Sequence, residues 1–318
     1  MKIFSVILLI YNSTMEKVLR TLDSILRQNL DTEEMEIIIA DDGSKRNLNN
    51  EIAAYLKGKD ITYKFTAHSE NLGTVKNIIE GLSICEGKYV KLIGAGDALF
   101  DKSVLKEVYT YMEQRNAECC FGLMQSFFYD KSGKIVQRPF RAPKDISVYR
   151  KRKVPWTQIE NDILIFGDWI SGASMFYRKE TLEFYLTRAK ENVKYCEDLI
   201  TANLVLDKKE IAFIERPVVW YELGDGITTA EKKENPFLKK IYRDHDKYFE
   251  YLRQQYPDSK KLKKNKKYVK YNRSHDWKCK ILKLFLTPER LEYILRVQGQ
   301  KEKELYKYQM VGFLDEKE

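Results

Sequence analysis

The first hundred residues alternate short apolar runs with segments of helical period, and this alternation limits the folds open to the chain. The apolar runs cover residues 4–10, 35–40, 61–65 and 89–93. Runs of aliphatic and β-branched residues are typical of strands buried on both faces of a parallel sheet, and strands that alternate with helices form right-handed βαβ units. The pattern predicts an α/β protein with a Rossmann-like, mostly parallel sheet flanked by helices.

Polar clusters follow the predicted strands. They read Tyr11-Asn12, Asp41-Asp42-Gly43-Ser44, Asn71-Leu72-Gly73-Thr74 and Gly94-Ala95-Gly96-Asp97. Open α/β sheets bind their ligands at the carboxyl ends of the strands, so we expect these clusters to line one binding edge. The two glycines before Asp97 let the backbone approach a ligand closely and present the carboxylate to it.

Beyond residue 100 the alternation is less regular. The expected elements are a helix at residues 103–115, a strand at 119–129, a helix at 195–206, and strands at 211–214 and 218–221. The polar stretch around Pro139, Pro143 and Pro155 lacks a period, which predicts a flexible loop. From residue 236 onward the chain is charged and of helical character.

Composition indicates a soluble globular protein. The 318 residues, 43% of them hydrophobic, suffice for a large core. Five scattered cysteines form neither a disulfide framework nor a CxxC pair, which favours a reducing compartment and no structural zinc. The apolar run at residues 3–10 is too short for a signal segment, and no run approaches the roughly 18 apolar residues of a membrane span. We therefore expect a cytoplasmic protein.

Positive charge is concentrated near the C-terminus. Residues 259–283 hold eleven Lys or Arg residues and one acid, Asp276, a net charge of +10, whereas the whole chain carries +9. Trp277, Ile281 and Phe285 add an apolar stripe that is typical of an interfacial membrane helix. We expect this region, residues 255–290, to contact an anionic membrane surface at the inner face of the membrane; a solvated helix face is the alternative, and no nucleic acid is expected as a partner.

The order of the polar motifs resembles that of the family 2 glycosyltransferases of the GT-A fold. Family members open with an apolar strand that ends in Tyr-Asn and carry Asp-Asp-Gly-Ser after the second strand, as residues 11–12 and 41–44 do here. A rhamnosyltransferase-like branch has Asn-x-Gly-x-x-Lys-Asn before the fourth strand, matched by residues 71–77. A glycine-rich strand entrance, the pair Glu197-Asp198 and a Gly-Ile-Thr loop at 226–228 follow.

This resemblance covers residues 3–230 and implies a division of the chain. It implies a nucleotide-sugar-binding half at residues 1–100 and, in the same GT-A domain, an acceptor-binding and catalytic-base half at 101–230. A basic, helical C-terminal extension follows at 231–318.

The resemblance assigns the donor nucleotide to the first half of that domain. The implied donor-binding residues are Tyr11, Asn12, Asp41, Asp42, Asn71, Gly73 and Lys76. A nucleotide base needs a flat face and an acceptor for its imide, which suit Tyr11 and Asp41. The diphosphate needs cations, either a metal ion or side chains such as Lys76.

The resemblance assigns the catalytic base to the acidic pair. A sugar hydroxyl that attacks an anomeric carbon needs a general base within hydrogen-bond reach. Asp198 is the implied base, with Glu197 orienting the acceptor, and a single displacement of this kind inverts the anomeric configuration. Trp169, Gly172 and Gly226 are expected on the acceptor side.

One motif departs from the family pattern. Family members end the fourth strand in Asp-x-Asp-Asp, whose carboxylates hold Mg²⁺ or Mn²⁺ on the donor diphosphate, but this chain reads Gly94-Ala95-Gly96-Asp97. Because a hard cation can be held by one or two carboxylates plus waters and phosphates, Asp97 is still a candidate ligand, with weakened affinity.

These inferences predict an inverting glycosyltransferase that moves a hexosyl or deoxyhexosyl group from a UDP- or dTDP-sugar. The expected acceptor is a hydroxyl of a glycan or a lipid-linked glycan in surface polysaccharide biosynthesis. A nucleotide-sugar-binding scaffold without catalysis is the main alternative, and a nucleotidyltransferase is a weaker one, because no glycine-rich, lysine-ended phosphate loop follows the first strand.

Structural alternatives stand beside the site assignments. Tyr11 and Trp169 could be packing residues, and Asp41 belongs to good β-turn chemistry. Asp198 could cap the helix it opens, and Asp97 could cap the helix that begins near Ser103.

Overall fold

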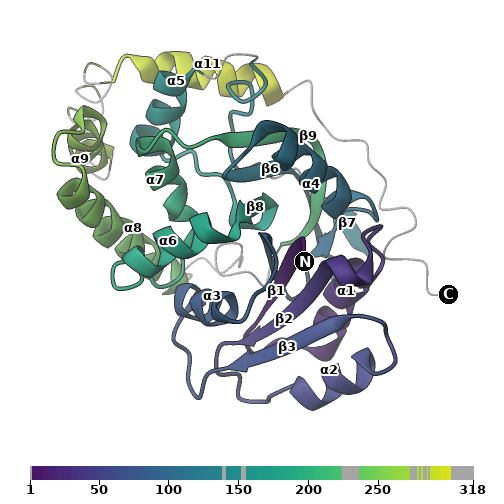
Figure 1. Cartoon of the computed structure of the whole chain (residues 1–318). Helices are drawn as coiled ribbons and strands as arrows, with labels where there is room; N and C mark the ends of the chain where they lie inside the picture. The colour runs from purple at the N-terminus through teal and green to yellow at the C-terminus, as the bar shows by residue number, and fades with distance from the viewer. Residues whose placement is uncertain are drawn as a thin grey trace.

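A computed structural model describes residues 2–137, 141–151, 155–223, 236–272, 278, 281, 285 and 287–301 of the chain. In these residues one sheet of nine strands runs through the molecule in the order β3-β2-β1-β4-β8-β6-β9-β5, and β7 pairs with the last residues of β6, beyond the short pairing of β6 with β8 (Figure 1). The fold is the predicted mixed α/β architecture.

The first four strands form the parallel half of the sheet. They are β1 (Phe4–Ile10), β2 (Met35–Asp41), β3 (Thr62–Ala67) and β4 (Tyr89–Gly94). Ile10 pairs with Asp41 and Leu9 with Gly94, so the carboxyl ends of three of these strands lie at one edge. This half confirms the alternation read from the sequence.

The other strands continue the sheet with mixed direction. They are β5 (Ala98–Leu99), β6 (Cys119–Tyr129), β7 (Ile135–Gln137), β8 (Met175–Arg178) and β9 (Ile211–Glu222). The antiparallel strand β8 joins β4 to β6, while β6 and β9 are parallel. The two short strands expected at 211–214 and 218–221 are one strand, because a register shift opposite Leu123 accommodates Pro217.

Helices cover both faces of the sheet. On one face lie α1 (Met15–Leu26), α2 (Asn49–Leu56) and α4 (Val104–Arg115), and on the other α3 (Thr74–Ser83), α6 (Lys179–Ala189) and α7 (Thr201–Leu206). The sequence analysis missed α6. Its buried residues Leu182, Tyr185, Leu186 and Ala189 have helical spacing, but charged residues around them weaken the pattern.

The prediction of a flexible loop around the prolines is wrong for the described residues. Strand β7, helix α5 (Trp156–Glu160) and the π-helical turn η2 (Asn161–Phe166) lie in this stretch. Ile146, Val148 and Ile163 are fully or almost fully buried in the core on the α3 side of the sheet. Apolar residues spaced too irregularly to show a period therefore still anchor the segment.

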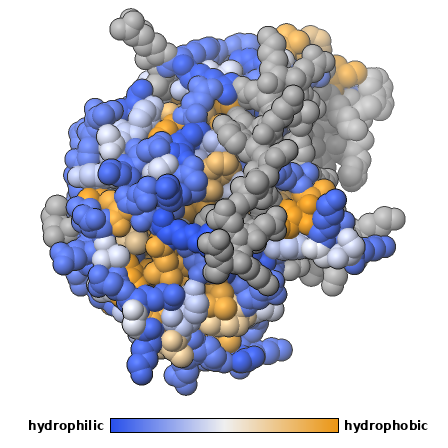
Figure 2. Space-filling view, turned by 90° about the vertical axis from the view of Figure 1, so that its right-hand side faces the viewer, coloured by the Kyte–Doolittle hydropathy of each residue, from blue (hydrophilic) through white to orange (hydrophobic). Residues whose placement is uncertain are grey.

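The C-terminal helices pack back onto this domain. They are α8 (Pro236–Gln255), α9 (Lys260–Asn272) and α11 (Glu289–Lys301). Tyr248 and Leu252 of α8 are buried in the main core, and Arg296 of α11 pairs with Asp145 at 2.5 Å and Asp162 at 2.7 Å. Within the described part of the chain, no helix combines the length and the apolar character needed to cross a bilayer. Figure 2 shows one face of the molecule as mostly hydrophilic, with hydrophobic side chains in separate patches.

Candidate active site

The turns after β1 and β2 hold each other at the carboxyl edge of the sheet. The backbone N–H of Asn12 donates to Ser44 Oγ at 2.8 Å, and Asn12 Oδ1 accepts from the N–H of Lys45 at 3.0 Å. Asn12 itself has a positive φ of 49°, a conformation that Asn tolerates well. Tyr11 is 48% exposed between these contacts, so its ring is open to a ligand instead of being packed in the core.

The two aspartates of the second turn have different surroundings. Asp41 is buried, and its Oδ1 accepts from the N–H of Ser44 at 2.9 Å. Both carboxylate oxygens of Asp42 accept backbone N–H groups, from Leu72 at 2.8 Å and from Gly73 at 2.9 Å. Burial raises the pKa of Asp42, and these two hydrogen bonds oppose the rise. Asp42 therefore holds the 71–73 loop in place, a structural use that the sequence did not indicate.

The loop at residues 71–74 joins the nucleotide half to the segment that leads into the acidic pair. Gly73 has φ +94°, and a Cβ on it would lie 2.3 Å from Lys194 Cγ. The carbonyl of Lys194 accepts from Val75 N–H at 3.1 Å, and Lys194 Nζ donates to the carbonyl of Asn71 at 3.3 Å. Only glycine combines this φ with so close an approach.

Lys76 lies farther out on α3 than its expected role suggests. Its side chain is 44% exposed, and its Nζ is 3.9 Å from Glu191 Oε1. The ammonium is thus accessible to an anion, and its contact with Glu191 is a weak surface pair.

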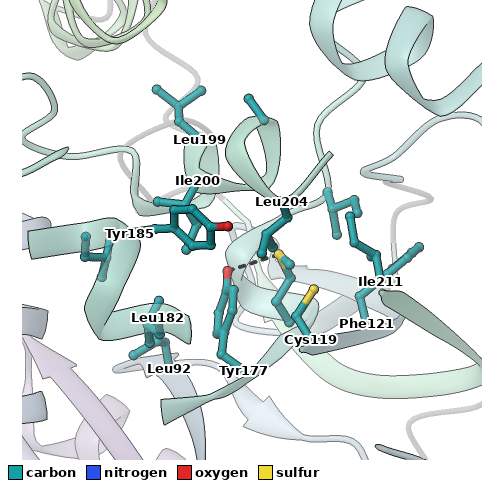
Figure 3. Packing of buried hydrophobic residues seen from close by; sticks show 14 of the residues in the cluster. Leu92, Cys119, Phe121, Tyr177, Leu182, Tyr185, Leu199, Ile200, Leu204 and Ile211 are labelled. Atoms are coloured by element: carbon teal, nitrogen blue, oxygen red, sulfur yellow. Dashed lines mark hydrogen bonds between the residues drawn. The ribbon is translucent and has the colours of Figure 1, made fainter. Parts of the chain in front are cut away.

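The acidic pair opens a short 3₁₀ helix, η4 (Glu197–Ile200). The next two residues, Leu199 and Ile200, are buried in the same core as Tyr185 and Leu204 and hold the pair in place (Figure 3). The N–H of Gly172 donates to the carboxylate of Asp198, and a Cβ on Gly172 would lie 2.2 Å from Glu197 Oε1. Gly172 thus leaves space for the two acids. It was expected on the acceptor side, and the structure places it directly against the predicted base.

The pKa values of both acids of the pair are raised. Burial is the main cause for each, and the neighbouring charge of Asp198 raises the pKa of Glu197 further. The hydrogen bond from Gly172 opposes the rise at Asp198. Because Asp198 uses its side chain in this contact with another segment, it does more than cap its own helix.

Lys91 is a buried residue near the site that the sequence analysis did not single out. It lies in the middle of β4 and is fully buried, with its Nζ donating to the carbonyls of Ala173 at 2.5 Å and Met175 at 3.3 Å. Burial lowers the pKa of its ammonium to about 7, against the opposite pull of Asp97 and Glu197. The sequence did contain a signal for this role: Lys91 is the one charged residue within the apolar strand at residues 89–93, and a buried ion needs partners.

Asp97 is hydrogen-bonded to the last residue of β9. Its Oδ1 accepts from the N–H of Glu222, the last residue of β9, at 2.9 Å. Burial raises the pKa of Asp97 to about 7, while this hydrogen bond and Lys91 oppose the rise. The alternative that Asp97 caps α4 is wrong, because Ser103 occupies the cap position of that helix.

Cations from α1 meet at the same turn. Glu222 pairs with Lys17 Nζ and with Arg20 Nη1, each at 3.0 Å, and Arg20 also donates to the carbonyl of Gly96 at 3.3 Å. Sequence reasoning did not single out these residues, because Glu222 lies 202 positions from Arg20.

Trp169 and Gly226 are the two remaining acceptor-side candidates. Trp169 packs edge-to-face on His245 and Phe249 of α8, with ring centroids 5.3 and 5.8 Å apart. It therefore links the domain to the C-terminal helices. Gly226 lies outside the described residues.

The chain is similar to known glycosyltransferases. Residues 5–182 match the family model described as "Glycosyl transferase family 2". The chain is 23% identical over 236 residues to "Uncharacterized glycosyltransferase MG025" of Mycoplasma genitalium, covering 74% of this chain and 72% of that protein.

Two Staphylococcus aureus proteins are also similar. "Poly(ribitol-phosphate) beta-N-acetylglucosaminyltransferase TarP" is 27% identical over 212 residues, which is 66% of this chain and 59% of TarP. Residues 1–349 of TarS, solved in complex with UDP-GlcNAc, have a TM-score of 0.54 at 15% identity, covering 94% of this chain and 83% of that one. The likeness to TarS shows that the fold is GT-A.

Proposed function

Because this chain belongs to glycosyl transferase family 2, we propose that it is an inverting glycosyltransferase whose donor is a UDP- or dTDP-linked sugar. The observation that supports this most is the position of Lys91 on β4: it lies close enough to both Asp97 at the donor edge and Glu197 of the acidic pair for their charges to act on it, and its Nζ donates to the carbonyl of Ala173, next to Gly172, which borders Glu197. A donor at that edge and a base on that pair would be neighbours. TarS, whose fold is similar, was solved in complex with UDP-GlcNAc.

In the proposed reaction, Tyr11 stacks on the nucleotide base and Asp41 accepts from its imide. Asp198 then removes the proton from the acceptor hydroxyl as it attacks the anomeric carbon, while Glu197 orients the acceptor. The raised pKa of Asp198 improves proton removal at neutral pH, since a stronger base has more driving force for the transfer. One displacement with one base inverts the configuration.

The loss of activity in a base variant tests this role. Asp198→Asn keeps the shape of the side chain and removes the base, so we expect the transfer or donor-hydrolysis rate to fall about 10²- to 10⁴-fold. Asp258→Asn, an exposed aspartate before α9, is the matched control and should keep the parental rate. Equal background rates in the parent and both variants would instead favour a nucleotide-sugar-binding scaffold without catalysis. Gly94 and Gly96, which stand where the family has acids, are the feature that suggests this alternative.

We also propose that the acceptor is a lipid-linked glycan of surface polysaccharide synthesis, reached by docking of the C-terminal helices on an anionic membrane. The support is the surface composition of this region. The exposed basic residues of α9 are Lys260, Lys263, Lys266, Lys267 and Lys270, and the exposed apolar residues beyond it are Ile281, Phe285, Leu291 and Leu295. Basic and apolar side chains exposed together are typical of membrane-surface helices.

Flotation with vesicles of anionic and of neutral lipid tests the docking. Each surface lysine near an anionic membrane contributes about 1 kcal/mol. Replacing Lys260, Lys263, Lys266 and Lys267 with Gln should therefore release the protein from anionic vesicles. Replacing Lys102, Lys106, Lys131 and Lys134, exposed lysines elsewhere, changes the net charge equally and should leave binding intact. Equal flotation of both variants would reject the docking surface.

A further inference from the structure

The turn at residues 94–97 does not fit the divalent cation that the family resemblance implies. Glycines occupy two of the three acid positions, and the remaining acid, Asp97, already accepts the N–H of Glu222 at 2.9 Å. Across the residues for which the structure gives positions, no three His, Cys, Asp or Glu side chains are grouped to hold a metal ion. A single buried and hydrogen-bonded carboxylate is a poor ligand set for Mg²⁺ or Mn²⁺.

An ion pair fills the space that the second missing acid would need. Gly96 has φ +109°, and a Cβ on it would lie 2.3 Å from Glu222 Oε2 and 3.5 Å from Lys17 Cδ. Glu222 is held there by Lys17 and Arg20 at 3.0 Å each. An aspartate at position 96 would therefore collide with this pair in addition to adopting a strained φ.

The turn also lacks the surplus negative charge of an acidic metal site. Lys17 and Arg20 pair with Glu222, Arg20 also lies 3.6 Å from Glu16, and Lys91 faces Asp97, so three cations match three anions. A carboxylate already matched by a cation attracts a divalent ion weakly, whereas an ammonium at the surface of such a set can contact a diphosphate directly. The side chain of Lys17 is 20% exposed and that of Arg20 is 9% exposed, so Lys17 is the cation that a ligand can reach.

We propose that this turn binds the donor diphosphate without a divalent cation, and that Lys17 is the positive charge that contacts it. The inference rests on the proposed function only in taking the ligand to be a nucleotide diphosphate. It assigns to a lysine of α1 the charge that the family takes from a metal ion held by aspartates.

Calorimetry of the full chain with UDP tests the proposal, once with EDTA and once with Mn²⁺. We expect the two dissociation constants to agree within about twofold, because no ligand set recruits the ion. Lys17→Gln should weaken UDP binding about tenfold or more in both conditions, since hydrogen bonds to charged groups are the strong ones. Lys106→Gln, an exposed lysine on α4, is the control and should bind UDP like the parent.

A second measurement does not depend on the nucleotide. The electron paramagnetic resonance signal of free Mn²⁺ is titrated with the full chain, with UDP alone, and with both. The proposal expects the chain to remove no more Mn²⁺ from solution than UDP alone does. Extra Mn²⁺ binding that disappears in Asp97→Asn would overturn it.

The outcomes separate this inference from the proposed function. UDP binding at least tenfold tighter with Mn²⁺, or unchanged in Lys17→Gln, overturns the inference and leaves the donor class intact. Failure of every nucleotide sugar to bind in either condition overturns the proposed donor class, and the Mn²⁺ titration then still decides whether the turn holds a metal ion.

Discussion

Removing Arg296 should detach α11 from the domain at a measurable cost in stability. The side chain of Arg296 is 15% exposed, and its Nη2 donates to both oxygens of Asp162 at 2.7 Å while its Nε bonds Asp145 at 2.5 Å. Asp145 is fully buried, and Asp162 almost so. The Arg296→Met variant would leave two buried carboxylates without their cation.

The size of the effect follows from this burial. Breaking a buried ion pair by removing one partner costs about 3–5 kcal/mol. At about 2 °C per kcal/mol for a chain of this size, the apparent Tm of Arg296→Met should fall by about 6–10 °C. Arg188→Met removes an exposed arginine that stacks on Phe184, and should cost less than about 1 kcal/mol.

The loss should also depend on pH. Burial raises the pKa of Asp162 to about 7, and Arg296 opposes the rise. A carboxyl group whose pKa is raised in the folded state keeps its proton there between about pH 4 and 7, so stability falls as pH rises through this range. Without Arg296 the pKa of Asp162 rises further, so the variant should lose more stability at pH 8 than at pH 5.5. Thermal unfolding followed by circular dichroism measures this. A Tm within 1–2 °C of the parent at pH 8, roughly the scatter expected of a surface substitution, would refute the reasoning.

Three further predictions concern the site. Gly73→Ala places a Cβ against Lys194 at positive φ and should cost about 1–3 kcal/mol, seen as a lower Tm and faster hydrogen exchange near Lys194; an unchanged Tm would contradict the close approach. Asp198→Asn removes the charge that raises the pKa of Glu197, so the Glu197 carboxyl should titrate at lower pH when followed by infrared difference spectroscopy; a pKa that stays or moves up would argue against coupling of the two acids. Tyr11→Ala should weaken UDP binding by about 1–3 kcal/mol in calorimetry while Tyr11→Phe keeps it, and equal affinities would exclude stacking on this ring.

The sequence was sufficient for the parts of the molecule in which local pattern and burial agree. The strands at residues 4–10 and 35–41 are buried on both faces, so their apolar composition alone was enough to predict them as strands of a parallel sheet. The resemblance to family 2 rested on turns at strand ends, and the family match and the GT-A fold confirm it. The roles assigned to single site residues stay predictions.

The sequence was insufficient where contacts between distant segments decide the structure. Asp42 looked like a ligand residue because its turn is a binding motif, but its oxygens hold the backbone of Leu72 and Gly73. Lys91 belongs to the site only because the fold places it near Asp97 and Glu197, which lie elsewhere in the sequence. Partners more than a hundred residues away, such as Glu222 for Arg20, leave no local pattern to read.

The hydrogen bonds of Asp244 on α8 bear on how this protein can be divided. Asp244 Oδ2 accepts the N–H groups of Lys194 at 2.9 Å and Tyr195 at 2.6 Å, two to three residues before Glu197. The C-terminal helices thus support the backbone that carries the candidate base. A shortened form that lacks them would lose the alignment of its acids together with any membrane contact, so its inactivity would say nothing about where the protein acts. Point substitutions of exposed residues, such as the lysines of α9, leave this support intact and can therefore separate catalysis from localisation.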